Sequence, residues 1–284
     1  MELVARQAVE GFLSGKHPSP YFGSSVEYAD HRPYSVGDEP RSIDWKLLAK
    51  TDKYYIKLFE EQTNVRCTIV VDTSRSMAFT SGDMSKLEYG THLAAALTYL
   101  LLRQNDAVGL ALFDSQVRQY LPPRATASHF SRIIEVMENA VPAADTRLGD
   151  VLHELAGRLP RRSMVVLVSD LLDDPERIAR GLAHFRHQRN EVIVFHLMDP
   201  QELTFPYERL TRFKDPEGTS MVVANPRTVR RRYMERLNDF MARIRRSCHE
   251  RGVDYQLAQT DVPYDKLLSN FLEQRARLKQ RRRK

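Results

Sequence analysis

The sequence has few cysteines, a single tryptophan and no long apolar run. Its 284 residues include only two cysteines, Cys67 and Cys248, and these form no metal-ligand spacing. We therefore expect two small buried thiols and no structural disulfide. The longest apolar stretches, SMVVLVS and EVIVFHLM, are far shorter than the roughly 20 residues that cross a bilayer. The N-terminus lacks a basic start followed by an apolar block, so we expect a cytoplasmic protein.

Acidic residues are absent from the C-terminal end of the chain. Residues 275–284, RARLKQRRRK, carry seven positive charges and account for the net charge of +6, because the remainder is close to neutral. Such a basic tail can bind phosphates, nucleic acid, an acidic partner or a membrane surface. A solvated helix end is the commoner explanation. Binding of phosphate, nucleic acid or another acidic surface through this tail is therefore an alternative function, and nucleic acid is not the partner we expect.

The motifs of several enzyme classes are also missing. There is no G-x-S-x-G, and His184 and His187 lack the glutamate of a zinc-binding H-E-x-x-H motif. A phosphoryl-transfer hydrolase of the haloacid dehalogenase type would use Asp72, after the first strand, as its nucleophile. That class needs a second acid where this chain has Ser74. We therefore expect a protein that is not an enzyme, and a hydrolase using Asp72 is the weaker alternative.

What the chain does have is an alternation of apolar strands and amphipathic helices from residue 66 almost to its end. Several strands are continuous Val, Ile and Leu runs, which is typical of strands buried on both faces of a parallel sheet. The expected strands are 66–72, 107–114, 116–122, 163–170, 191–199 and 253–260, and the expected helices are 86–104, 127–141, 147–159, 175–189 and 229–251. This predicts an α/β fold with a doubly wound, mostly parallel sheet flanked by helices. Strand 116–122 follows its predecessor too closely for a crossover helix and should be an antiparallel edge strand.

The first 65 residues differ in composition from the rest. They are rich in Tyr, Pro, Gly and paired charges and contain the one tryptophan, Trp45. We expect residues 1–65 to form a small, partly β appendage packed on the main domain, with Trp45 anchoring that packing. The main domain should cover 66–274, with an irregular loop or hairpin inserted at about 200–228. Residues 275–284 complete the chain as the basic tail.

Polar side chains follow the first buried strand in IVVDTSRSM, where Asp72, Ser74 and Ser76 alternate with other residues. They could form an ordinary strand end with a helix cap. They could also converge as hard oxygen ligands, which suit Mg²⁺ and not zinc. Ligands bind at the carboxyl ends of parallel strands, and four predicted strands end in aspartate: Asp72, Asp114, Asp170 and Asp199. For Asp114 and Asp199 we expect only a capping role.

The segment VDTSRSM resembles the metal-ion-dependent adhesion site of von Willebrand factor A domains. That site has D-x-S-x-S, then a threonine in a later loop, then an aspartate after the fourth buried strand. Thr146 precedes a predicted helix and Asp170 ends the next strand, so both later elements match in kind and order. The resemblance covers roughly 66–260 and departs at Leu171, where the family has glycine. It implies Mg²⁺, or Mn²⁺ or Ca²⁺, held by Asp72, Ser74, Ser76, Thr146 and Asp170.

Residues 31–46, HRPYSVGDEPRSIDWK, followed by FEE at 59–61 and the first strand, resemble the family called domain of unknown function 58. These are bacterial proteins that combine such a segment with an A-type domain, and the match covers nearly the whole chain. Members are similar in context to partners of MoxR-type AAA+ ATPases. The resemblance implies a metal-dependent protein-interaction module, an adaptor or co-factor of such an ATPase, whose partner offers an Asp or Glu to the metal.

Overall fold

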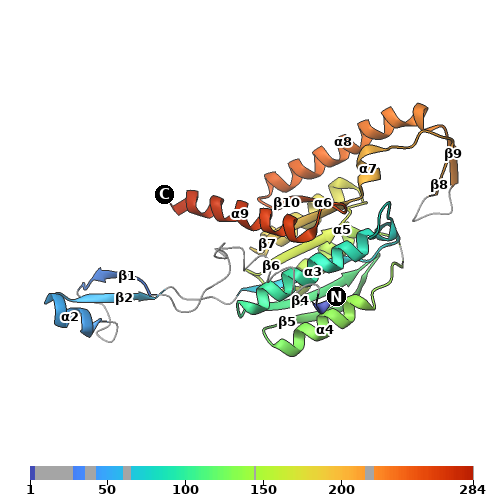
Figure 1. Cartoon of the computed structure of the whole chain (residues 1–284). Helices are drawn as coiled ribbons and strands as arrows, with labels where there is room; N and C mark the ends of the chain where they lie inside the picture. The colour runs from blue at the N-terminus through green and yellow to red at the C-terminus, as the bar shows by residue number, and fades with distance from the viewer. Residues whose placement is uncertain (4–27, 36–42, 60–64, 144, 215–220, 284) are drawn as a thin grey trace. The chain divides into compact units, whose positions relative to one another are not determined.

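The structure, a computed structural model, describes residues 1–3, 28–35, 43–59, 65–143, 145–214 and 221–283 (Figure 1). The chain divides into two compact units. One consists of Met1–Tyr21 together with Val65–Lys284, and the other of Phe22–Asn64. Whether residues 1–65 pack on the main domain concerns the relation between the units and stays a prediction.

The smaller unit contains two antiparallel strands and a short helix: β1 (Tyr28–Pro33), α2 (Trp45–Thr51) and β2 (Tyr55–Phe59). Asp44 caps α2, since its Oδ1 atom accepts a hydrogen bond from the backbone N–H of Lys46 at 2.9 Å. Ile43 forms a bridge with Ile56, and both side chains are buried. Trp45 begins α2 with 61% of its surface exposed, and its predicted contact with the main domain stays a prediction.

The larger unit is built on a six-stranded sheet with the order β10-β7-β6-β3-β4-β5. Its strands are β3 (Arg66–Asp72), β4 (Ala107–Phe113), β5 (Val117–Arg124), β6 (Met164–Ser169), β7 (Glu191–Met198) and β10 (Asp254–Gln259). All neighbouring pairs are parallel except β4 and β5, which are antiparallel at the edge. The predicted fold class is confirmed, including its antiparallel edge strand. The predicted and observed bounds of these strands differ by no more than two residues.

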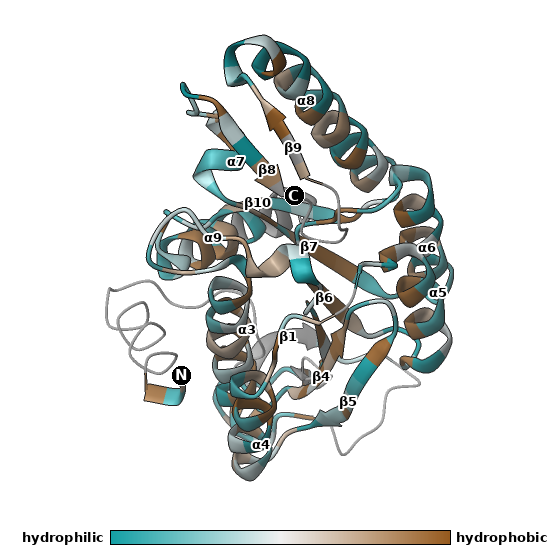
Figure 2. Cartoon of the chain, turned by 90° about the vertical axis from the view of Figure 1, so that its right-hand side faces the viewer, coloured by the Kyte–Doolittle hydropathy of each residue, from teal (hydrophilic) through white to brown (hydrophobic). Residues whose placement is uncertain are grey.

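Helices cover both faces of this sheet (Figures 1 and 2). One layer contains α3 (Lys86–Arg103), α4 (Ala127–Glu138) and α9 (Tyr264–Arg283), and the other contains α5 (Leu148–Arg158), α6 (Pro175–His187) and α8 (Pro226–Glu250). Every residue of β6 is buried, which is why its sequence is a continuous apolar run and not an alternating one. Figure 2 shows the hydrophobic sheet between helices whose outer faces are hydrophilic.

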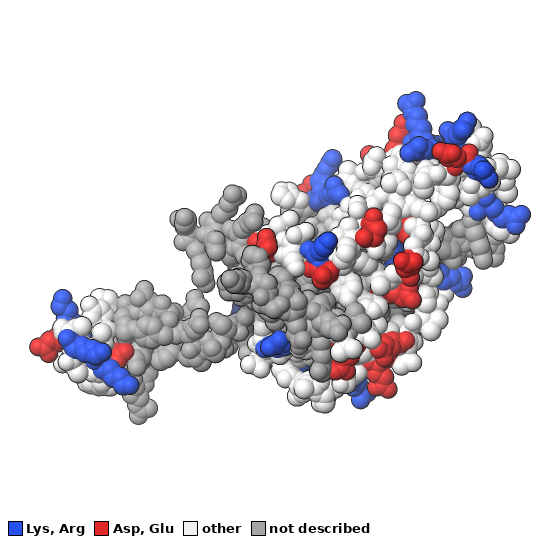
Figure 3. Space-filling view, in the orientation of Figure 1, with Lys and Arg blue, Asp and Glu red and all other residues white. Residues whose placement is uncertain are grey.

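The predicted insertion between β7 and α8 is a short helix followed by a hairpin. It consists of α7 (Pro200–Thr204), β8 (Thr211–Lys214) and β9 (Met221–Ala224). Phe205 stacks on Phe213 with ring centroids 5.5 Å apart and also contacts Tyr233 of α8 at 4.7 Å. These aromatic contacts fix the hairpin against α8. Lys and Arg side chains gather on this part of the molecule in Figure 3, near the beginning of α8.

The predictions for the cysteines and the tail have different outcomes. Cys67 and Cys248 are both buried and free, as predicted.

The basic tail continues helix α9, and its first residue, Arg275, contributes to the fold. Only 11% of the Arg275 side chain is exposed, and it forms ion pairs with Glu191 and Asp254. The side chains of 276–284 lie outside the described residues. Within the described part of the chain, no helix has the length and apolar character needed to span a membrane.

Candidate metal site

The parallel pairing of β3 with β6 brings two of the predicted ligands to the same edge of the sheet. Val71 lies opposite Val168, so Asp72 and the Ser169–Asp170 pair come next to each other where both strands end. Ser169 Oγ donates a hydrogen bond to Asp72 Oδ2 at 2.6 Å. Asp72 is completely buried and Asp170 is 1% exposed. Two buried carboxylates therefore lie at the carboxyl ends of neighbouring central strands.

The D-x-S-x-S loop turns directly after β3 into a single 3₁₀ turn, η2 (Arg75–Ala78), with Ser74 at its N-cap position. Asp72 Oδ1 accepts a hydrogen bond from the backbone N–H of Ser74 at 2.9 Å. The hydroxyl oxygens of Ser74 and Ser76 are 3.1 Å apart, and both side chains are buried. Asp72 does stabilise the local turn, and the turn also points two hydroxyls at each other. The two explanations that the sequence allowed, a helix cap and a set of metal ligands, are therefore compatible.

The loop that carries Thr146 is attached to the D-x-S-x-S loop. The backbone N–H of Ala143 donates to the Thr73 carbonyl at 3.0 Å, and Arg75 Nε donates to the Ala143 carbonyl at 2.6 Å. An exposed ion pair between Arg75 and Asp145, at 3.7 Å, adds little to this attachment. The hydroxyl oxygen of Thr146 is shielded from solvent. These contacts hold the two loops together, while coordination by Thr146 stays a prediction.

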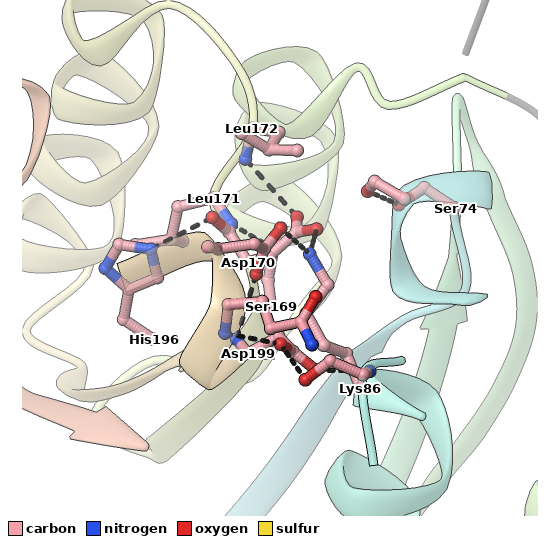
Figure 4. A network of polar contacts seen from close by, with 12 residues as sticks. Ser74, Lys86, Ser169, Asp170, Leu171, Leu172, His196 and Asp199 are labelled. Carbon is pink, nitrogen blue, oxygen red and sulfur yellow. Dashed lines mark hydrogen bonds and ion pairs between the residues drawn. The ribbon is translucent and has the colours of Figure 1, made fainter. Parts of the chain in front are cut away.

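Asp170 contacts a residue that the sequence did not indicate, Lys86 in the first turn of α3 (Figure 4). Lys86 Nζ donates to Asp170 Oδ2 at 2.7 Å and to Glu202 Oε1 at 2.9 Å. Only 1% of the Lys86 side chain is exposed. A lysine near the start of an amphipathic helix ordinarily lies in solvent, so nothing in the local sequence signals this burial.

The backbone around Asp170 is held in place by a buried histidine and an unusual leucine. The main-chain oxygen of Asp170 lies 3.0 Å from His196 Nε2, and His196 Nδ1 lies 2.7 Å from the Tyr255 hydroxyl. Burial lowers the pKa of His196 to about 4, so the imidazole is neutral near pH 7. Leu171 has a φ of 57°, in the left-handed region that favours glycine. Leu171, which stands where the A-domain pattern has glycine, therefore adopts a backbone conformation that glycine would adopt without strain.

Charge is concentrated at this edge of the sheet. Burial, and then the negative charge of Asp170, raise the pKa of Asp72 to about 7, although hydrogen bonds from Ser169 and Ser74 oppose the shift. Burial acts to lower the pKa of Lys86, but the charges of Asp170 and Glu202 outweigh it and hold that pKa above its ordinary value. Lys86 is therefore a permanent cation, and Asp72 experiences repulsion that a second cation would relieve.

The residues present fit a small divalent cation. Oxygens next to each other around octahedral Mg²⁺ lie about 3 Å apart, because Mg–O bonds are about 2.0–2.1 Å long. The Ser74 and Ser76 hydroxyls, at 3.1 Å, have this spacing. Among the described residues there is no metal-binding group of three or more His, Cys, Asp or Glu. The present set differs from such groups because it combines two carboxylates with three hydroxyls.

The capping role predicted for the other two aspartates at strand ends is confirmed for Asp199 and wrong for Asp114. Asp199 caps α7, since its Oδ1 atom accepts a hydrogen bond from the backbone N–H of Gln201 at 2.8 Å. Asp114 does not cap a helix. It stabilises the turn between β4 and β5 by accepting hydrogen bonds from the Gln116 backbone and from the Arg118 side chain.

A mostly parallel six-stranded sheet with a D-x-S-x-S loop at the carboxyl end of a central strand defines a domain like those of von Willebrand factor A. Comparison with protein families is more specific. The family described as "Protein of unknown function DUF58" matches residues 30–242, and the chain belongs to this family.

Curated relatives of the chain include an uncharacterized protein of Mycobacterium bovis. It is 26% identical over 211 residues, which cover 72% of this chain and 65% of the relative. Uncharacterized proteins of two Mycobacterium tuberculosis strains match to the same extent. The chain therefore spans just under two thirds of the length of the curated relatives it matches.

Solved structures with the same fold include the conserved hypothetical protein BatB from Bacteroides thetaiotaomicron. It matches with a TM-score of 0.52 and 17% identity, over 75% of this chain and 99% of that one. An aerotolerance-related membrane protein from Bacteroides fragilis matches with a TM-score of 0.51 and 18% identity, over 75% and 98% of the two chains. These similarities show the fold alone. The descriptions of these proteins name no enzymatic activity.

Proposed function

We propose that the chain is a non-enzymatic protein-interaction module that binds its partner through a divalent cation. Asp72, Ser74, Ser76, Thr146 and Asp170 hold Mg²⁺, Mn²⁺ or Ca²⁺, and the bound cation supplies a Lewis-acidic position for an Asp or Glu of the partner. The observation that supports this best is the pair of buried hydroxyls 3.1 Å apart beside two buried carboxylates.

Exposed apolar side chains near the site support a protein as the partner. Leu172, two residues after Asp170, is 43% exposed, and Val141, in the loop that leads to Thr146, is 72% exposed. Large apolar side chains on the rim of a polar site are suited to contact with another protein. The family resemblance suggests a MoxR-type AAA+ ATPase as this partner.

Two features favour this function over a hydrolase. Asp72 has no exposed surface, and each of its carboxylate oxygens already accepts a hydrogen bond. Ser74 stands where a haloacid dehalogenase would have its second acid. A nucleophile must reach the substrate, so a buried carboxylate that holds the loop in place is better suited to a structural and metal-binding role.

Calorimetric titration of the purified chain with Mn²⁺ tests the metal. We expect saturable binding to the wild type, and binding at least about tenfold weaker in Ser76→Ala and in Asp72→Asn. Ser76→Ala loses a hydroxyl ligand, and Asp72→Asn loses a negative charge and one of its two carboxylate oxygens. Asp114→Asn is the matched control, since it neutralises a buried carboxylate at the end of the next strand. No binding by the wild type, or equal binding by Ser76→Ala, would reject the metal site.

The same variants test the partner. At constant Mg²⁺ concentration, a purified MoxR-type ATPase should bind the wild type and Asp114→Asn equally and Ser76→Ala at least about tenfold more weakly. Constant Mg²⁺ is necessary because the ATPase itself needs Mg²⁺ for nucleotide binding. Equal binding of all three forms would exclude the metal site as the contact. Salt-sensitive binding of nucleic acid that disappears when 276–284 are deleted would favour the tail instead.

A further inference from the structure

The ammonium group of Lys86 lies against the candidate metal site, and in its protonated form it has no lone pair to offer a cation. It is buried 2.7 Å from the carboxylate of Asp170 (Figure 4). It also lies 2.9 Å from the carboxylate of Glu202. A lone buried charge is very costly, so a lysine that is 1% exposed needs these partners. Lys86 contacts Oδ2 of Asp170. The hydrogen bond found for Oδ1 among the described residues is a long one, 3.4 Å from the Leu172 backbone nitrogen.

The fold places Lys86 at this position through two local features. Ser85 and Glu88 form a capping box that fixes the first turn of α3. Gly90, one turn later, allows α3 to lie close to the sheet. A Cβ atom at Gly90 would be only 3.0 Å from Leu197 and 3.1 Å from Val168. α3 therefore begins beside the ends of β6 and β7, where Asp170 and the segment leading to Glu202 are found.

Glu202 is held on the other side of Lys86 by an independent set of contacts. Its Oε2 atom accepts a hydrogen bond from the backbone N–H of Asp199 at 2.9 Å, in the capping box of α7. Its main-chain oxygen accepts a hydrogen bond from the Tyr233 hydroxyl at 2.9 Å. The Lys86 ammonium thus has a fixed acid on each side. Glu202 cannot move away from the lysine without losing its hydrogen bond in the capping box of α7, and Asp170 is held directly after the end of β6.

These residues give the site a defined charge. Asp72, Asp170 and Glu202 contribute three negative charges when ionised, and Lys86 contributes one positive charge. In the chain without its partner, this excess of two negative charges is neutralised by a divalent cation. A trivalent cation would leave a net positive charge, and charge imbalance is costly where the dielectric constant is low. Asp199 is also buried nearby, but in the hydrogen bonds found among the described residues it contacts neither Lys86 nor Asp72, and the donors of Ser81 and of the N-terminus of α7 stabilise its charge locally.

We propose that Lys86, held between Asp170 and Glu202, is a positioning residue that sets the charge of the cation the site accepts. It restricts the site to divalent ions by cancelling one of three negative charges, and it orients the Asp170 carboxylate. This inference rests on the proposed metal-binding function. It goes further by giving cation selectivity to two residues, Lys86 and Glu202, that are not ligands.

Two substitutions change the site charge in opposite directions without removing a proposed ligand. Lys86→Met makes the site more negative by one charge, and Glu202→Gln makes it less negative by one. Arg158→Met is the control, because it removes a positive charge at the far end of α5, where Arg158 pairs only with Glu154 in the ion pairs found among the described residues. Bound Mn²⁺ is measured by electron paramagnetic resonance, and is then displaced by Ca²⁺ or by a trivalent lanthanide of similar radius.

The quantity measured is the ratio of lanthanide affinity to Ca²⁺ affinity. A general loss of structure would not raise this ratio in one variant and lower it in the other. We expect this ratio to increase on the order of tenfold in Lys86→Met and to decrease by a similar factor in Glu202→Gln. The ratio should be unchanged in Arg158→Met. If Lys86→Met does not fold, the Glu202→Gln result alone decides the proposal.

The possible failures are distinguishable. Unchanged ratios in variants that still bind Mn²⁺ would overturn the role of Lys86 and leave the metal site intact. Weaker binding of both ions by the same factor in Lys86→Met would overturn it equally, since that result indicates only a structural ion pair. If the wild type binds neither Mn²⁺ nor the lanthanide, the proposed function itself is wrong and the selectivity has no site to act on.

Discussion

At the scale of single residues, Leu171 combines a left-handed backbone conformation with a buried side chain. Its φ of 57° is in the region where a side chain costs about 1–2 kcal/mol. The same side chain is 1% exposed and belongs to the core cluster that includes residues of α5 and α6. Burial of a leucine contributes about 1.5–3 kcal/mol, which offsets the backbone strain.

This balance predicts that glycine is more stable than alanine at position 171, the reverse of the order within a helix. Leu171→Gly and Leu171→Ala both lose the buried side chain, but glycine also loses the backbone strain, so Leu171→Gly should be about 1 kcal/mol more stable than Leu171→Ala. At the control position Leu152, in helix α5 and the same cluster, alanine should be more stable than glycine by about 1 kcal/mol. Denaturant unfolding of the four variants measures both differences. Alanine as the better residue at both positions would refute the role of the left-handed backbone.

At the scale of helices and strands, the distance between α3 and the sheet decides where the buried lysine lies. Gly90 faces Leu197 and Val168 at the sheet surface, whereas a Cβ atom added at Gly157 of α5 would meet no atom within 4 Å. Both glycines are in helices, so helix propensity alone would favour replacing either one. The two glycines differ in their surroundings, because of the two only Gly90 is required for close packing of its helix on the sheet.

Replacement of each glycine by valine tests this difference. Gly90→Val should destabilise the protein by about 1–3 kcal/mol, because the added methyl groups overpack the interface between α3 and the sheet. Gly157→Val should be neutral or slightly stabilising, since the side chain points into open space and valine is a better helix former than glycine. Thermal and denaturant unfolding measure both changes. A neutral Gly90→Val would show that α3 can move from the sheet without cost.

At the scale of the whole molecule, the stability of the larger unit depends on pH through a buried acid outside the metal site. Asp106 precedes β4 and is 3% exposed. Its Oδ1 atom accepts a hydrogen bond from the Val65 backbone at 2.9 Å, while Oδ2 is buried with no hydrogen-bond partner found in the described part of the chain. Burial raises its pKa from 3.8 to about 6, and the Val65 hydrogen bond only partly opposes this.

The folded protein therefore binds the Asp106 proton more tightly than the unfolded chain does. The contribution of this group to stability is fully present below pH 4 and is lost as pH rises through about 6. Asp106→Asn removes this dependence, and it should be more stable than the wild type by about 1–3 kcal/mol at pH 7.5, with the difference shrinking toward pH 4. Urea unfolding in chelator across this range measures it. Parallel curves for the two proteins would contradict the prediction.

The sheet, its edge strand and the proposed metal ligands could be predicted from the sequence, because these predictions depend on local patterns. Continuous apolar runs identify strands buried on both faces, and D-x-S-x-S follows the strand that the pattern makes central. The burial of Lys86 against Asp170 and the hydrogen bond from Ser169 to Asp72 could be found only in the folded chain. Those contacts join residues 84 and 97 positions apart. They arise from strand order and helix packing, which no local period of the sequence encodes.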